Sequence, residues 1–105
     1  MANKHQMTVE VALPPEKAEA ALYEAFLAAG IQGVRGGGGV MQGTLPMSMS
    51  SYGESIDATI AHGPHGAVVA MQSRCALPTT LFDLGRNRKN LEKIVAALRT
   101  LAPVL

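Results

Sequence analysis

The chain has 105 residues, of which 48% are hydrophobic and 16% are charged, and its formal net charge is +1. This length suits one domain with a single core, and the composition excludes an intrinsically disordered chain, which has few apolar and many charged residues. The near-neutral charge provides no overall attraction to nucleic acid, so nucleic-acid binding is not expected.

The single cysteine, Cys75, excludes an intrachain disulfide and a cysteine-based zinc site. No apolar stretch of signal-peptide length follows the N-terminal residues, and no run approaches the ~20 apolar residues that cross a bilayer. These features predict a cytoplasmic protein without a membrane span. No set of residues predicts a metal site or any other cofactor.

The first part of the chain predicts a strand followed by a helix. Residues 6–13 alternate between apolar and polar side chains, which is typical of a strand with one buried face. The apolar side chains expected to face the helices are Met7, Val9, Val11 and Leu13. Pro15 suits the first turn of a helix, and an apolar stripe predicts that this helix covers about residues 15–29.

Seven glycines lie between Gly30 and Gly43, and four of them are consecutive at Gly36–Gly39. One interpretation is a cradle of backbone amides that binds phosphate beside Arg35. Phosphate-binding glycine motifs lie between a strand and a following helix, whereas here a strand is expected to follow. We therefore predict that Gly36–Gly39 forms a mobile loop.

Three strands and a second helix are predicted after this segment. The strands are expected over residues 40–49, 54–62 and 67–75, and the helix over about residues 80–101. In the middle strand, the side chains expected to face the helices are Ile56, Ala58 and Ile60.

The resulting order, β-α-β-β-β-α, favours an α+β two-layer sandwich that forms a single domain over residues 6–102. Sequential hairpins would produce a four-stranded antiparallel sheet of order 1-4-3-2, with both helices on one face.

The last helix has an amide inside its apolar stripe. At 100° per residue, Leu91 and Leu98 share one direction, and Asn87 projects into the same sector. A buried amide without partners costs about 1–3 kcal/mol, so Asn87 must bond to groups elsewhere in the fold. We predict that it bonds to backbone groups of residues 50–54, because Gly53 indicates an irregularity in that strand.

Polar residues and glycines form three short motifs: Ser51-Tyr52-Gly53-Glu54, Ser73 to Thr79, and Asp83-x-Gly85-x-Asn87-x-x-Asn90. Together they resemble a family of small bacterial domains with the same element order and no assigned activity, in which Trp is common at the positions of Tyr52 and Leu84. The resemblance implies the fold and a structural polar network, but no catalytic residue and no ligand. The expected members of the network are Asp83, Asn87, Asn90, Ser51, Tyr52, Gly53 and Glu54.

Charged side chains and histidines suggest two alternative functions. Arg86, Lys89 and Lys93 share the solvent side of the last helix, where they could bind the phosphates of nucleic acid or an anionic lipid surface. His62 and His65 lie on one turn, but the sequence offers no obvious third and fourth metal ligand beside them. A small enzyme of unknown class is least favoured, because no nucleophile-elbow sequence accompanies the serines.

The leading hypothesis is a non-catalytic module that mediates protein association or binds a small apolar ligand. Two helices on one face would leave the other face of the sheet open. That face would carry Val68 and Ala70, or Val69 and Met71 in the opposite register, beside Ala12. Exposed apolar groups on a sheet often mark an association surface, so a homo-oligomer or an unknown protein partner is expected there.

Overall fold

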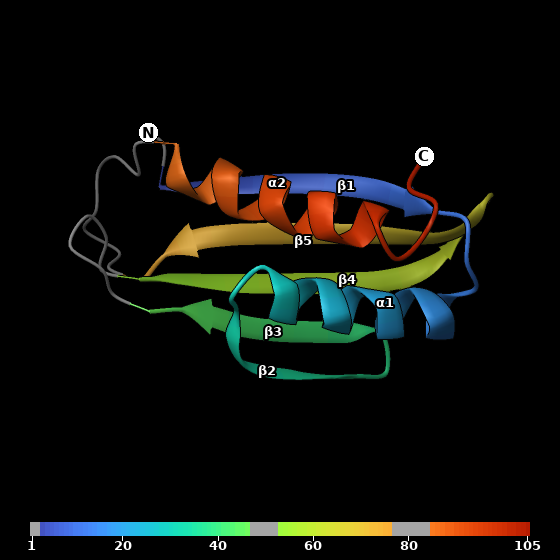
Figure 1. The fold of residues 1–105 in the computed structure, drawn as a ribbon, viewed down its shortest axis with the longest axis horizontal. Coiled ribbons are helices and arrows are strands. Elements are labelled where there is room, and N and C mark those ends of the chain that lie inside the picture. The colour runs from blue at the N-terminus through green and yellow to red at the C-terminus, as the bar shows by residue number, and fades with distance from the viewer. Residues whose placement is uncertain (1–2, 47–52, 77–84) are drawn as a thin grey trace.

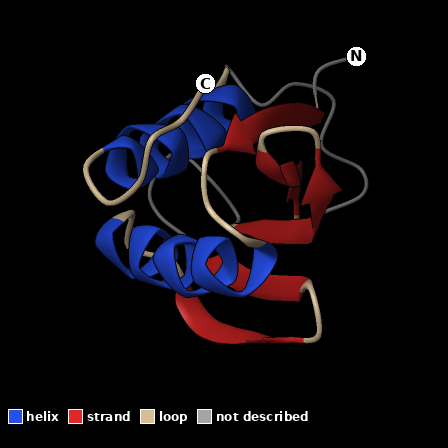
Figure 2. Cartoon of the chain, turned by 90° about the vertical axis from the view of Figure 1, so that its right-hand side faces the viewer, coloured by secondary structure: helices blue, strands red, loops and turns tan. Residues whose placement is uncertain are grey.

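The computed structural model describes residues 3–46, 53–76 and 85–105 of the chain. In these ranges an antiparallel sheet has the strand order β1-β5-β4-β3-β2. The strands are β1 (Lys4–Val11), β2 (Gln32–Gly37), β3 (Val40–Leu45), β4 (Glu54–Gly63) and β5 (Gly66–Cys75), and the helices are α1 (Pro15–Ala28) and α2 (Arg86–Arg99). Both helices lie on the same side of the sheet (Figures 1 and 2).

The predicted four-stranded sheet is wrong, because the glycine-rich segment forms a fifth strand. β2 and β3 form a hairpin in which Gly36 pairs with Met41 and Gly37 pairs with Val40. Gly38 and Gly39 form its turn with φ angles of 64° and 85°, which glycine adopts without strain. The predicted loop over residues 36–39 is therefore a strand end and a tight turn. Pairing with β3 outweighs the low strand propensity of glycine.

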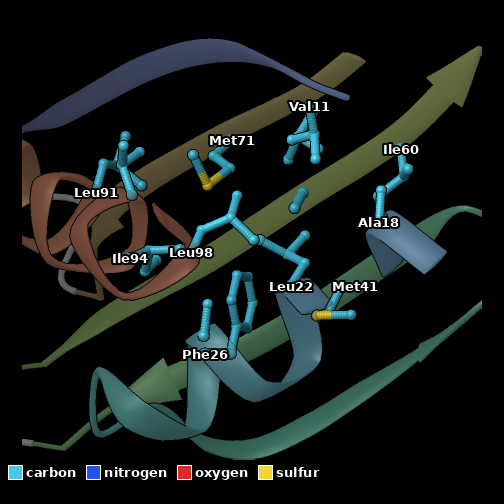
Figure 3. Close-up of a cluster of buried hydrophobic side chains, with 14 of the residues drawn as sticks. Val11, Ala18, Leu22, Phe26, Met41, Ile60, Met71, Leu91, Ile94 and Leu98 are labelled. Carbon is cyan, nitrogen blue, oxygen red and sulfur yellow. The ribbon is translucent and has the colours of Figure 1, made fainter. Parts of the chain in front are cut away.

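The hydrophobic core lies between the sheet and the two helices. Figure 3 shows Leu22 and Phe26 of α1 beside Leu98 of α2, and all three side chains are fully buried. The two predicted apolar faces are confirmed: Val11, Ile56, Ala58 and Ile60 are buried, and Met7, Val9 and Leu13 pack against the buried cluster. Burying one aliphatic or aromatic side chain fully contributes about 1.5–3 kcal/mol, so this layer is the main source of stability.

The two helices begin differently. α1 begins at Pro15, as predicted, and ends one residue earlier than expected. α2 begins at Arg86 rather than near residue 80, because Gly85 has a left-handed φ of 75° that cannot continue an α-helix. Residues 77–84, which contain the rest of the predicted helix start, lie outside the described ranges.

The ordered structure extends slightly beyond the predicted limits of residues 6 and 102. β1 begins at Lys4, and Val104 forms an isolated bridge with Val11. No helix within the described ranges has both the length and the apolar character that crossing a membrane requires.

Candidate functional site

A buried polar cluster, formed by Glu54, Ser73, Asn87 and Asn90, joins α2 to β4 and β5. Asn87 and Ser73 are 0% exposed, Glu54 is 4% exposed and Asn90 is 9% exposed. The Ser73 hydroxyl donates to Asn87 Oδ1 at 2.7 Å. Asn90 Nδ2 donates to Glu54 Oε1 at 3.0 Å and to Ser73 Oγ at 3.2 Å. The burial of Asn87 confirms what its position in the apolar stripe predicted.

The described partners of the Asn87 side chain lie on β5. Besides its bond to Ser73, its Nδ2 donates to Cys75 Sγ over 3.5 Å, and sulfur is a weak acceptor. Gly53 is buried, and its carbonyl accepts a hydrogen bond from the Ala76 N–H at 2.9 Å. The other expected members, Asp83, Ser51 and Tyr52, lie outside the described residues.

Two members of this arrangement, Ser73 and Cys75, were not predicted to contact Asn87. They follow Val69 and Met71 at alternate positions of one strand, and strand alternation places all four on the face toward the helices. Alternation could therefore have identified Ser73 and Cys75 as residues facing α2. It could not have identified Asn87 as their partner, because that depends on how α2 is placed along β5.

The hydrogen bonds of the polar cluster are typical of a structural contact between two elements. Among the described residues, no buried side-chain nitrogen or oxygen lacks a hydrogen-bond partner. Catalysis by a serine requires an accessible hydroxyl whose proton is taken by a base. The Ser73 hydroxyl is inaccessible and donates to an amide oxygen instead. This geometry favours a role in joining α2 to the sheet.

The basic residues of α2 are only partly brought together. Lys89 and Lys93 are exposed one turn apart, whereas Arg86 is half-buried at the start of the helix. Arg88 Nε lies 3.2 Å from Glu92 Oε2 in an exposed pair that contributes about 0.3–0.5 kcal/mol. Anion binding by Arg86, Lys89 and Lys93 stays a prediction.

The face of the sheet away from the helices, here called the open face, has an uncharged row of side chains across its middle. Thr8, Ala70 and Thr59 lie side by side across β1, β5 and β4. Val68 and Ala70 point outward, and Val69 and Met71 point into the core, which decides between the two predicted registers. A shallow hollow of about 380 Å³ lies over this row and the next one, and its lining includes Gln6, Thr8, Asp57, Thr59, Ala70 and Gln72. The face is more polar than the sequence suggested.

Charged side chains lie at the two ends of the open face, and the ends differ in sign. Lys4 and Arg74 are neighbours on β1 and β5 at one end. Arg74 lies 3.9 Å from Asp57, which is farther along the face. At the other end, Glu10 Oε1 lies 3.2 Å from His65 Nδ1.

The two histidines near the β4–β5 turn contact different parts of the molecule; His62 belongs to β4, and His65 lies in the turn. His65 contacts Glu10 on β1, whereas His62 lines a hollow beside α1 together with Glu16 and Glu19. In the part of the chain that the structure describes, no group of three His, Cys, Asp or Glu side chains is placed to hold a metal ion.

Comparison with known proteins identifies the fold, but no family, ligand or activity. No family model matches the chain, and no curated protein matches it. Solved structures do match, among them the crystal structure of Ara h 8.0201, with a TM-score of 0.54 over 93% of this chain and 97% of that chain. The sequence identity is 12%, so this likeness carries no information about a ligand or an activity. The resemblance to small bacterial domains stays a prediction, and the chain is similar to Ara h 8.0201 in fold.

Proposed function

We propose that this chain is a non-catalytic association module whose open face binds the open face of a second copy. The observation that carries the proposal is the distribution of charge on that face. Thr8, Ala70 and Thr59 form an uncharged row across its middle. Protein interfaces are depleted of charged residues at their centres and have polar, solvated rims. The open face resembles this arrangement: Lys4, Arg74 and Glu10 lie toward the ends of the strands, and Asp57, which is nearer the centre, lies 3.9 Å from Arg74.

The opposite signs of the two ends favour one orientation of the copies. A two-fold axis that lies between the faces and runs perpendicular to the strands places each end of one copy over the opposite end of the other. Lys4 and Arg74 of one copy then lie over Glu10 of the second, and the same contacts recur by symmetry. Complementary charge fixes orientation more than it adds affinity. The uncharged row across the middle would therefore contribute most of the binding free energy.

The open face is large enough for a weak specific dimer. β4 and β5 have 10 residues each, and a rise of about 3.3 Å per residue makes the face roughly 30 Å long. Neighbouring strands about 4.8 Å apart make it roughly 20 Å wide. Each copy would therefore bury about 600 Å², and a total of about 1,200 Å² is the lower limit for stable specific interfaces.

Binding of a small apolar ligand has less support. In the described part of the chain, fully buried side chains such as Leu22, Phe26 and Leu98 pack between the helices and the sheet. The hollow on the open face is lined mainly by glutamine, threonine and small residues, which offer little apolar surface to such a ligand.

The proposal is tested by placing a charge at the centre of the face. Ala70→Arg would bury two guanidinium groups close together in the dimer. We expect its dimer dissociation constant, measured by sedimentation velocity, to rise at least ~100-fold, equivalent to about 2.7 kcal/mol. The matched control is Ala96→Arg, the same change at an exposed position of α2 on the opposite side of the molecule.

Charge reversal tests the orientation. Lys4→Glu alone should weaken the dimer, because it places like charges over one another at both ends. The double variant Lys4→Glu with Glu10→Lys exchanges the signs of this pair while Arg74 stays, and it should bind more tightly than Lys4→Glu alone. Equal dissociation constants for the wild type and Ala70→Arg, or equal weakening by Ala70→Arg and Ala96→Arg, would contradict an interface on the open face.

A further inference from the structure

β2 is an edge strand whose outer side is uncovered. In the sheet formed by the described residues it pairs with β3 alone. Its residues are exposed apart from Val34, which is half-buried. The opposite edge, β1, is partly covered by the C-terminal residues, because the Leu105 N–H donates to the Glu10 carbonyl at 2.9 Å. An uncovered edge strand presents backbone donors and acceptors to another extended chain.

The backbone N–H and C=O groups of β2 that point away from β3 are centred on Gly36. Gly37 and Val40 flank the two-residue turn, so their backbone groups bond to each other. Backbone groups alternate in direction along an antiparallel strand, so those of Gly36 point outward. The pairing register shifts between Gln32 and Arg35, which limits regular pairing to the second half of the strand.

A groove of about 560 Å³ runs beside this edge, between β2 and α1. Its helix wall carries Glu16, Glu19 and Glu24, together with Tyr23, which is 41% exposed. Glu19 Oε1 accepts a hydrogen bond from the Gly39 N–H at 2.8 Å and so holds the β2–β3 turn. Neither Glu16 nor Glu24 forms an ion pair with another described residue. Two carboxylates therefore face the groove without an ion pair to a described residue, and Arg35 of β2 is the cation that also lines it.

Gly36 also keeps the groove open at its strand wall. A Cβ atom at this position would lie 3.0 Å from the Val40 carbonyl oxygen and 3.4 Å from Met41 Cγ. Any side chain at residue 36 would also project into the space beside α1, because Gly36 lines the groove. Gly36 thus directs its backbone groups outward, and because it has no side chain it leaves the groove beside it open.

We propose that the β2 edge and this groove bind an extended basic segment of a partner protein, which adds a strand to the sheet. Every second side chain of an added strand would point to the helix side. Lysine or arginine there would lie near Glu16 and Glu24 and could contact the ring face of Tyr23. The intervening side chains would lie on the open face, where Arg35, which pairs with Gln42 and lines hollows on both sides of the edge, disfavours further cations. The preferred segment therefore alternates basic and uncharged residues.

The probe is a fluorescent peptide in which lysine and threonine alternate, and binding is followed by fluorescence anisotropy at low ionic strength. We expect it to bind, and a peptide of alternating glutamate and threonine to show no binding. Glu16→Gln combined with Glu24→Gln should weaken binding at least ~5-fold. Glu92→Gln, which removes one exposed carboxylate from α2, should leave the affinity unchanged.

Two further peptides separate strand addition from attraction by charge alone. One has the same composition with all lysines preceding all threonines, and the other has the alternating sequence with methylated backbone amides. Both should bind at least ~10-fold more weakly, because the first cannot place its lysines on one side and the second lacks backbone donors. Equal affinity of all three basic peptides, or no binding of the alternating one, would overturn the proposal. The open-face variant Ala70→Arg should bind the peptide as the wild type does, so this test is independent of self-association.

Discussion

At the scale of single residues, the contact between Asn87 and β5 is the most informative feature of the protein. Helical periodicity alone predicted that this amide is buried, because it lies in the direction of Leu91 and Leu98. The identity of its partners, Ser73 and Cys75, could not be predicted, because it depends on how α2 is placed along β5. The local sequence pattern predicts the direction in which a side chain points. It does not predict which residues of the neighbouring element that side chain contacts.

Replacing Asn87 with alanine should lower the free energy of unfolding by about 1–3 kcal/mol. The change leaves the buried Ser73 hydroxyl without its acceptor in a region that water does not reach. Urea denaturation followed by circular dichroism measures the effect, and Lys89→Ala on the exposed side of α2 is the control. A variant that keeps full stability but no longer self-associates would show that the polar cluster is a binding site.

At the scale of elements, β2 shows where prediction from sequence fails. Its sequence, Gln-Gly-Val-Arg-Gly-Gly, contains one β-branched residue and no aromatic residue, so strand propensity gives almost no signal. The strand exists because β3 pairs with it and α1 packs beside it, and both are tertiary effects. One local signal was present, since two adjacent glycines between paired segments are typical of a two-residue hairpin turn.

The two turn glycines should tolerate substitution unequally. Both have positive φ, so alanine at either position costs about 1–2 kcal/mol of backbone strain. A Cβ at Gly39 would also lie 2.8 Å from the Ile60 carbonyl oxygen, whereas one at Gly38 meets nothing within 4 Å. Gly39→Ala should therefore destabilise the protein more than Gly38→Ala in thermal or urea unfolding. Indistinguishable losses from the two variants would disprove the tight turn.

At the scale of the whole molecule, the sequence predicted the apolar faces of the strands and the presence of an open face. Alternation along each strand also places Thr8 and Thr59 on that face, but it could not predict that the registers align them with Ala70 in one row. The same registers separate Lys4 and Arg74 from Glu10. The proposed dimer therefore rests on the alignment of three strands, β1, β4 and β5.

The molar mass of the wild-type chain as a function of concentration tests the proposed self-association most directly. We expect light scattering at low ionic strength to show a rise from the monomer mass of 11.0 kDa to twice that value, between about 1 μM and about 1 mM. Added salt should move this rise to higher concentration, because it screens the attraction between the ends of opposite charge. A mass that stays at 11.0 kDa up to about 1 mM would contradict the account.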